Sequence, residues 1–431
     1  MRAQTPAADA DVLLEFLFRL GQAYLACGEQ TAKVELTLRR IATANRMRRA
    51  RVVLFPTAVF ITLHDGEQER VTLAEGPSDS FRLDQIADVY ELGSAAEAGA
   101  ISPAMGLERL NEIRRKGARF GKAGVIVGHA ILSIGVAIVL APTFPSIVAT
   151  SVLGAIVGIL KVFNQNRPLF AVPVPVVAAM LVSTLVFVAV EKGFPVDPLH
   201  VLVPPLVTFL PGAVLTLGMV DLAYGDMVSG SSRLIAGFVQ LVLLAFGLVA
   251  GAMVVGYTPY NLLDAVSPVV DAPWIPWAGV IVFGLGSYLH FSAPRRSLGW
   301  TLILLLLTFG AQQMGSVVIG AGMGGFFGML VATPLSYLIH MRFRGPPAMV
   351  TFLPSFWLLV PGALGLLSTA RILSDRDAGI DGLIAVVFLF TSIALGTLMG
   401  ASVYKWLTET FGKWQLQIGR VGAYLRTPRK R

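Results

Sequence analysis

Long apolar stretches, separated by short polar segments, fill the sequence from Gly121 onward. An α-helix needs about 20 consecutive apolar residues to cross a bilayer, and ten stretches of roughly that length follow one another here. We therefore predict ten transmembrane helices. Their expected positions are residues 122–141, 145–162, 169–190, 199–221, 233–256, 274–293, 299–318, 322–341, 347–371 and 379–405.

The first 120 residues show a different pattern, with helical and strand periodicities in turn. Two amphipathic runs precede two β-rich runs on either side of an Asp65-Gly66 turn signal, and two further helical patterns follow. We predict that residues 1–120 form an α+β domain of two helices, a hairpin or small sheet, and two more helices. The runs are residues 11–26, 30–44, 52–63, 70–74, 83–97 and 102–119.

The composition is that of an integral membrane protein. Of 431 residues, 55% are hydrophobic and only 14% are charged, and the mean hydropathy is +0.71. The net charge of +8 lies mostly in the membrane region, where an excess of Lys and Arg sets orientation. We therefore predict contact with membrane lipid and no nucleic-acid partner.

Basic residues concentrate in alternate loops. If the 1–120 domain is cytoplasmic, the inner segments hold most of the Lys and Arg residues, and the outer loops hold only Lys192, Arg371 and Arg376. This distribution follows the positive-inside rule. The N-terminus shows no pattern of a cleaved signal peptide. We predict a multi-pass protein with both ends in the cytoplasm.

The two halves of the membrane region repeat. A shift of 150 residues places Pro211-Gly212 on Pro361-Gly362, and a shift of 149 places two glycines of the fifth span on two of the tenth. A shift of 143 also matches a five-residue segment, but the longer shift matches the loops as well. Five helices per copy is an odd number, so the copies enter the membrane from opposite sides. We predict an inverted 5+5 repeat, with halves at residues 121–256 and 274–405 and a basic cytoplasmic tail at 406–431.

Each half carries a Pro-Gly pair inside a span, and proline followed by glycine breaks or kinks a helix. A half-helix that starts at such a break offers free N–H groups and a positive dipole end, which suit a carboxylate. The alternative is that these breaks only shape packing. The predicted substrate-binding residues are Pro211, Gly212, Ala213, Pro361, Gly362 and Ala363.

Ionisable residues follow the first break. Asp221, Asp226 and Arg233 lie at or beyond the cytoplasmic end of the fourth span, where a carboxylate could carry a coupling proton. Solvation at the membrane interface or helix capping would explain them equally well. His129 lies inside the first span and is interpreted as a neutral structural histidine, and Gln240 as a hydrogen-bonding contact between helices.

Enzymatic and metal sites are not indicated. Cys27 is the single cysteine, the five histidines show no ligand spacing, and no nucleophile–base pair or phosphate-binding loop is present in the sequence. We predict a protein that is not an enzyme and that uses no metal and no cofactor.

With these residues identified, the sequence resembles the threonine/serine exporter family of bacterial inner-membrane proteins. Gly28–Glu35 is similar to a family element in the N-terminal domain, here called the head, with Lys33 in place of arginine. Pro211-Gly212 together with the residues from Asp221 to Arg233 resembles the family's most specific signature. In the second half, Ala363 replaces the expected serine.

This resemblance implies proton-driven efflux of threonine, serine or a similar small carboxylate from the cytoplasm. Two-component relatives are associated with dicarboxylate export, so succinate is an alternative substrate. A passive channel, and a membrane enzyme or sensor that acts through the head, are the other classes considered. The oligomeric state, including a homo-oligomer, stays open.

Overall fold

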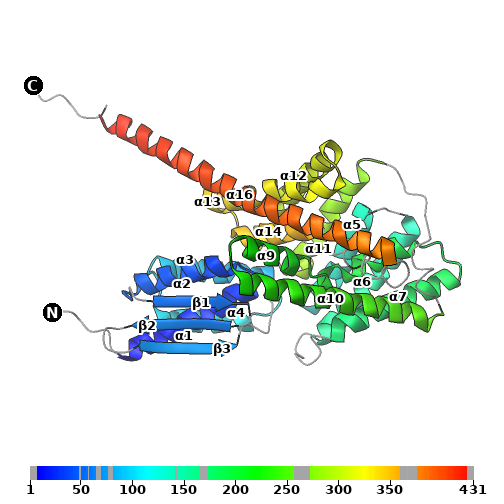
Figure 1. Cartoon of the computed structure of the whole chain (residues 1–431), viewed down its shortest axis with the longest axis horizontal. Helices are drawn as coiled ribbons and strands as arrows, with labels where there is room; N and C mark the ends of the chain where they lie inside the picture. The colour runs from blue at the N-terminus through cyan, green and yellow to red at the C-terminus, as the bar shows by residue number, and fades with distance from the viewer. Residues whose placement is uncertain are drawn as a thin grey trace, which may run out of the picture.

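The computed structural model describes residues 7–47, 50–56, 58–64, 69–75, 81–140, 143–164, 173–256, 272–359, 366 and 376–424. The predicted motif at Pro361, Gly362 and Ala363 lies outside these residues, as does the Asp65-Gly66 turn. Figure 1 shows two parts, a head of helices and strands at the left and a bundle of helices at the right.

The described residues of the head form four helices and a three-stranded antiparallel sheet in the order β1-β2-β3. Residues 52–63 were expected to form one β segment, but they form parts of two strands. Pro56 explains the difference, because proline cannot donate a hydrogen bond to the strand ladder and favours a turn. The elements are α1 (Ala7–Ala26), α2 (Thr31–Ala44), β1 (Ala50–Phe55), β2 (Ala58–His64), β3 (Glu69–Glu75), α3 (Leu83–Glu97) and α4 (Pro103–Arg115).

One face of the sheet is buried. Alternate residues such as Val52, Val59 and Ile61 have no exposed surface, which is the period of two that a half-buried strand requires. They pack with the apolar side of α1, where Phe16 and Leu17 are buried, in one hydrophobic core. Burial of these side chains is the main stabilisation of the head.

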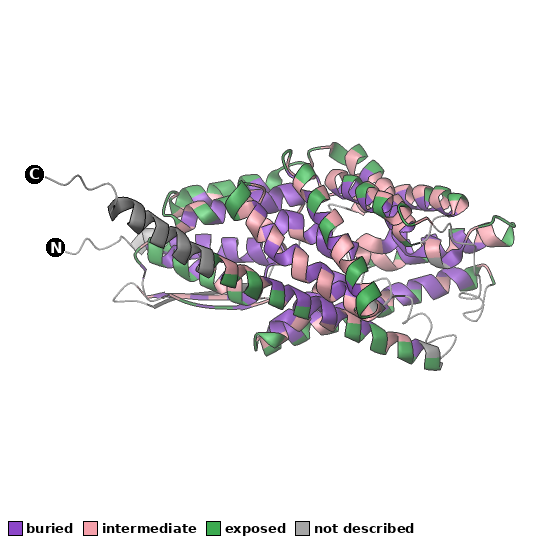
Figure 2. Cartoon of the chain, turned by 90° about the horizontal axis from the view of Figure 1, so that it is seen from above, coloured by how far each residue is buried: buried purple, intermediate pink, exposed green. Residues whose placement is uncertain are grey.

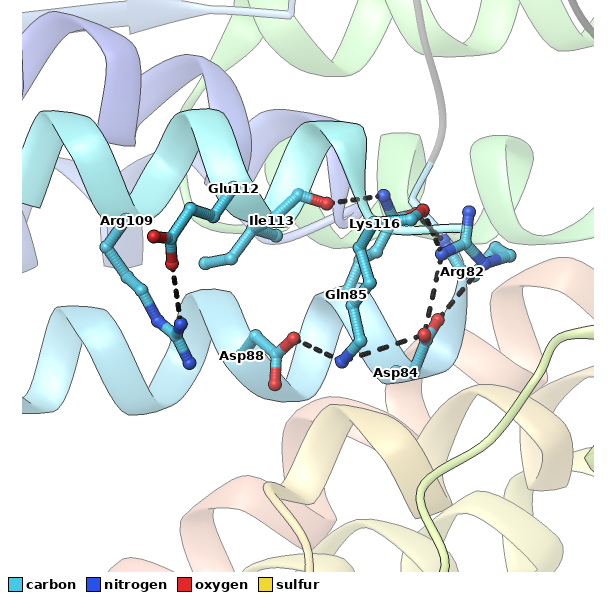
Figure 3. A network of polar contacts seen from close by, with 8 residues as sticks. All are labelled: Arg82, Asp84, Gln85, Asp88, Arg109, Glu112, Ile113 and Lys116. Carbon is cyan, nitrogen blue, oxygen red and sulfur yellow. Dashed lines mark hydrogen bonds and ion pairs between the residues drawn. The ribbon is translucent and has the colours of Figure 1, made fainter. Parts of the chain in front are cut away.

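Polar contacts join α3 to α4 (Figure 3). Lys116 Nζ lies 2.5 Å from Asp88 Oδ2 and 3.7 Å from Asp84 Oδ2, and Arg82 Nε lies 3.1 Å from Asp84 Oδ1. Gln85 Nε2 donates a 2.8 Å hydrogen bond to the Ile113 carbonyl. These contacts fix the C-terminal end of α4, from which the chain continues into the bundle.

Seven helices of the described chain are long and apolar enough to cross a membrane, and three shorter apolar helices accompany them. The chain is a multi-pass membrane protein. The bundle contains α5 (Gly121–Leu140), α6 (Phe144–Asn164), α7 (Pro173–Glu191), α8 (Pro198–Leu202), η2 (Pro204–Phe209), α9 (Gly212–Ala223), α10 (Met227–Val254), α11 (Ile275–His290), α12 (Leu298–Val318), η4 (Ala321–Met323), α13 (Gly324–Phe343), α14 (Ala348–Leu358) and α16 (Arg376–Tyr424).

The distribution of apolar and polar side chains in the bundle is opposite to that of a water-soluble protein. Large apolar side chains such as Phe163, Phe246 and Ile384 are more than half exposed, whereas Ser133, Thr308 and other hydroxyl side chains are buried. Figure 2 shows exposed positions on the outer faces of the helices and buried positions inside. An apolar exterior is the surface that contact with lipid tails requires.

Glycines allow close helix contacts in both halves of the bundle. A Cβ atom at Gly247 or Gly251 of α10 would meet the carbonyl oxygens of Val176 and Met180 in α7. A Cβ atom at Gly396 or Gly400 of α16 would meet carbonyl oxygens of α13, those of Phe326 and Met329. In each pair the backbones approach as closely as small-residue interfaces in membranes permit.

The head packs on one end of the bundle. Met349, Val350 and Leu353 of α14 belong to the hydrophobic core of the head, and the Leu83 N–H donates a 3.0 Å hydrogen bond to the Phe291 carbonyl just after α11. Arg119 Nη1 reaches Tyr288 Oη at 3.0 Å. The last described turns of α16 lie on this same side of the bundle (Figure 1).

Candidate functional site

The fourth predicted span, residues 199–221, is not a continuous helix. It consists of the short helix α8, the 3-10 helix η2, an extended residue at Leu210, and then α9. Pro211 occupies the N-cap position with φ −80° and ψ 27°, and α9 begins at Gly212. The predicted break is therefore present, and it extends further toward the N-terminus than Pro211 because Pro204 and Pro205 also lack the N–H that an α-helix needs.

Side chains from neighbouring helices bind the carbonyl groups that the break releases. His129 of α5 lies with its Nε2 atom 2.9 Å from the Pro205 carbonyl oxygen. Gln240 of α10 donates a 2.6 Å hydrogen bond to the Phe209 carbonyl. An unpaired carbonyl in hydrocarbon costs several kcal/mol, so these two side chains make the break possible inside an apolar bundle.

A second polar cluster lies where α9 and α10 meet the head. Asp221 is buried, and its Oδ2 atom lies 3.4 Å from Arg233 Nε. Arg233 Nη2 donates a 3.0 Å hydrogen bond to the backbone carbonyl of Glu29. Thr31 Oγ1 donates a 2.9 Å hydrogen bond to Asp226 Oδ2. All three predicted coupling residues thus contact either one another or the N-terminal segment of α2.

Glu29 is the centre of the head side of this cluster. Its carboxylate lies 2.6 Å from Lys33 Nζ and accepts a hydrogen bond from the Tyr90 hydroxyl. Lys33 Nζ in turn lies 3.4 Å from Tyr337 Oη of α13, and Tyr337 stacks on Tyr404 of α16 with ring centroids 4.9 Å apart. The cluster therefore links α2 and α3 of the head to α13 and α16 of the bundle.

Burial and the neighbouring positive charge shift the pKa of Glu29 in opposite directions. Burial alone would raise the pKa of Glu29, but the Lys33 ammonium and hydrogen bonds from Lys33, Tyr90 and the Gln30 N–H lower the pKa below its ordinary value. The same ion pair raises the pKa of Lys33, although partial burial of that side chain acts in the opposite direction. Both groups are therefore charged at neutral pH.

Comparison with known families gives a match that covers most of these elements. Residues 15–255 match the model of the ThrE family, described as "Putative threonine/serine exporter". The chain belongs to this family. The matched region contains the head elements around Glu29, the broken fourth segment, and α10 with Arg233. No curated protein and no solved structure matches the chain.

The two sequence elements that resemble this exporter family, Gly28–Glu35 and the segment from Asp221 to Arg233, are almost 200 residues apart but meet in space. Their meeting could not be read from either element alone. Tyr90 and Tyr337 were not predicted, because a single tyrosine within a helical pattern carries no spacing signal.

The ion pair of Asp221 and Arg233 is only partly satisfied. Within the described chain, Asp221 Oδ2 and Arg233 Nη1 are buried atoms that have no hydrogen-bond partner. A 3.4 Å ion pair without a hydrogen bond leaves much of the cost of burying the two charges uncompensated. Such a pair can change partners at a lower cost than a fully bonded one.

We expect replacement of Glu29 by Gln to lower the melting temperature of the purified protein at pH 7 by about 2–4 °C, because Lys33 loses its charged partner. Because the pKa of Glu29 is lowered in the folded state, its stabilising contribution is complete at pH values above the ordinary glutamate pKa of 4.5. This contribution is lost as the pH falls through the lowered pKa. The difference between the wild type and Glu29→Gln should therefore shrink below pH 4.5.

The matched control is Glu15→Gln, which removes a glutamate from an exposed ion pair with Arg19 one turn away on the same helix. Exposed pairs contribute little, so the melting temperature should barely change. Scanning fluorimetry at several pH values measures both variants. A Glu29→Gln protein as stable as the wild type at pH 7 would contradict the role of Glu29 in joining the head to the bundle.

Proposed function

We propose that this protein exports threonine, serine or a similar small amino acid from the cytoplasm, driven by the proton gradient. One observation carries the proposal, the broken segment around Pro211 whose released carbonyls are bound by His129 and Gln240. Helix breaks deep in a bundle are typical of the substrate sites of secondary transporters. Membership of the exporter family supports the same direction of transport.

The packing of the bundle supports the proposed inverted 5+5 repeat of residues 121–256 and 274–405. Gly247 and Gly251 contact α7, the third span of the first half, and Gly396 and Gly400 contact α13, the third span of the second half. The glycine pairs and the helices that they contact are related by nearly the same shift of the sequence. In this arrangement residues 1–120 are a cytoplasmic domain and residues 406–431 a cytoplasmic tail.

Substrate would bind at Pro211, Gly212 and Ala213 and at the matching residues of the second half, Pro361-Gly362-Ala363. The first N–H groups of α9 have no partner within the helix and attract a negative charge. A carboxylate is common to threonine, serine and dicarboxylates. The break therefore supports export of a small carboxylate, and succinate is the alternative to an amino acid.

Proton coupling is assigned to Asp221 and Asp226, with Arg233 as the cation that faces them. The incomplete bonding of the Asp221–Arg233 pair supports this assignment, because one proton on Asp221 would release Arg233 for another partner. Asp226 lies at the N-cap of α10 but its side chain does not cap the helix; it contacts Thr31 of the head instead. A change of protonation would thus alter the contact between head and bundle.

The orientation in the inner membrane can be tested with single cysteines in a Cys27→Ala background. Lys192, which follows α7, should face the periplasm, and Arg295, between α11 and α12, should face the cytoplasm; both are exposed. A membrane-impermeant thiol reagent should label Lys192→Cys in intact cells and Arg295→Cys only after the cells are lysed. The reverse labelling pattern would mean that the protein has the opposite orientation in the membrane. Export would then be the wrong direction of transport.

The function is tested with purified protein in liposomes loaded with labelled threonine, serine or succinate under an imposed pH gradient. We expect efflux that collapses when an uncoupler removes the gradient. Gly212→Leu should reduce efflux to background, since a branched side chain fills the start of α9 where backbone must approach substrate. Gly299→Leu is the control, because Gly299 also lies in the first turn of a helix but has open space around its Cβ position.

Equal transport by Gly212→Leu and Gly299→Leu, at equal protein levels, would mean that the break serves packing alone. Efflux that the uncoupler leaves unchanged and that never runs against the substrate gradient would indicate a passive channel.

Asp221→Asn and Asp226→Asn keep the size and hydrogen bonding of the side chain but remove its titration. We expect each variant to lose accumulation of substrate against its gradient while it retains downhill exchange, because the proton is then no longer linked to the transport cycle. Counterflow and pH-driven uptake, measured on the same proteoliposomes, separate the two activities. If both variants still concentrate substrate, neither aspartate is the coupling residue.

A further inference from the structure

A group of basic side chains lies beside the break and takes no part in the polar cluster around Asp221 and Glu29. Lys161 of α6 places its Nζ atom 2.8 Å from Thr208 Oγ1, in η2, and 3.3 Å from His290 Nε2, at the end of α11. The ammonium group also lies 5.1 Å from the ring centroid of Phe209. His129 completes the group, with its ring centroid 4.8 Å from that of His290. We call these four polar residues, Lys161, His290, His129 and Thr208, the basic cluster.

Hydrogen bonds to carbonyl groups fix the arrangement of both histidines. His290 Nδ1 lies 2.9 Å from the Val125 carbonyl oxygen, which can only accept, so Nδ1 carries a hydrogen and Nε2 is free to accept from Lys161. The same argument for His129 places a hydrogen on Nε2, which donates to Pro205. His129 Nδ1 is then left buried and without a partner in the described chain.

Lys161 has no opposite charge beside it among the described residues. The groups that contact Lys161 there are a hydroxyl, an imidazole nitrogen and an aromatic ring, and no carboxylate of the described residues is within ion-pair distance of its ammonium. A charged side chain inside a membrane bundle usually has an opposite charge or faces a binding site. Lys161 has three N–H donors and uses two, so one remains for an anion.

The position of the cluster indicates what the anion is. Thr208 and Phe209 belong to the segment that precedes Gly212, so the ammonium group lies beside the break at which substrate is proposed to bind. Lys161 and Thr208 are both partly exposed, whereas His129 and His290 are buried. The two partly exposed residues are the ones beside the break, and the buried histidines hold the break and the lysine in place.

We propose that the basic cluster binds the carboxylate group of the transported substrate, with Lys161 as the residue that makes the ion pair. This inference rests on the proposed function and adds the group that recognises the substrate. It places the specificity for a carboxylate on one side chain and not on the helix break alone. A substrate analogue with an uncharged amide in place of the carboxylate would leave Lys161 without a partner and should be rejected.

The test compares binding of two pairs of ligands that differ only at the carboxylate, threonine with threoninamide and succinate with succinamide. Purified wild-type protein should bind one of the carboxylates about 10- to 100-fold more tightly than its amide, the range expected for a hydrogen bond to a charged group. In Lys161→Met this preference should fall to about onefold. Lys161→Arg keeps the charge and should retain most of the preference.

Lys192→Met is the matched control, since it removes an exposed lysine whose side chain has no contact with the basic cluster in the described chain, and it should bind like the wild type. The preference for carboxylate over amide distinguishes a role of Lys161 in recognition from a role in folding. If Lys161 were merely structural, its loss would weaken the binding of both ligands equally. The melting temperature of ligand-free Lys161→Met should equal or exceed that of the wild type, as an unneutralised charge is lost from the bundle.

Three contrary results can be distinguished. If the wild type exports a carboxylate and Lys161→Met keeps the full preference over the amide, the basic cluster does not recognise the substrate but the exporter function stands. If the wild type neither binds nor exports any of the four ligands, the proposed function fails and the assignment of Lys161 fails with it. A lower melting temperature with an equal loss for carboxylate and amide would assign Lys161 a structural role.

Discussion

Backbone groups that leave a helix inside an apolar bundle need partners, and this requirement shapes the membrane region of the protein. The fourth segment releases the carbonyls of Pro205 and Phe209, and His129 and Gln240 bind them. Each of these side chains comes from a different helix. The break is therefore a joint property of α5, α10 and η2, and its position depends on how these helices pack. Close contacts of glycine with backbone, such as Gly128 against His290, bring α5 and α11 near enough for the basic cluster to form.

The head is held to the bundle by two kinds of contact. Apolar side chains of α14 enter the core of the head, and this burial is insensitive to pH. The polar contacts around Glu29, Lys33 and Tyr337 depend on charge, and they connect the head to α13. The same region reaches Arg233 through the Glu29 carbonyl. The head is thus attached both by contacts that do not depend on charge and by contacts that do.

Apolar length and proline content were enough to predict the helices and the first break, because both act locally. Within the described residues, seven of the predicted spans coincide with helices long enough to cross a membrane, the sixth and ninth coincide with the shorter helices α11 and α14, and the fourth contains the break that Pro211 predicted. Contacts between residues that are far apart in the sequence could not be predicted in this way. His129 was interpreted as a structural histidine, and its contact with the Pro205 carbonyl depends on the packing of α5 against η2. Lys161 lies at the end of the second predicted span, residues 145–162, and only its contacts with Thr208 and His290 show that it lies beside the break.

The basic cluster and the Asp221–Arg233 pair are separate sites. Their separation limits how proton movement could drive transport of the substrate. The basic cluster contains no described carboxylate, so a substrate carboxylate at Lys161 and a proton on Asp221 would not compete for one residue. In the proposed mechanism, coupling would pass through the structure between them. That structure is α9, whose 12 residues begin just after the break and span roughly 18 Å. Asp221 lies near its other end and contacts Arg233 of α10. A movement of α9 as a rigid helix would change the break and the aspartate together, which is the simplest link that the described contacts allow.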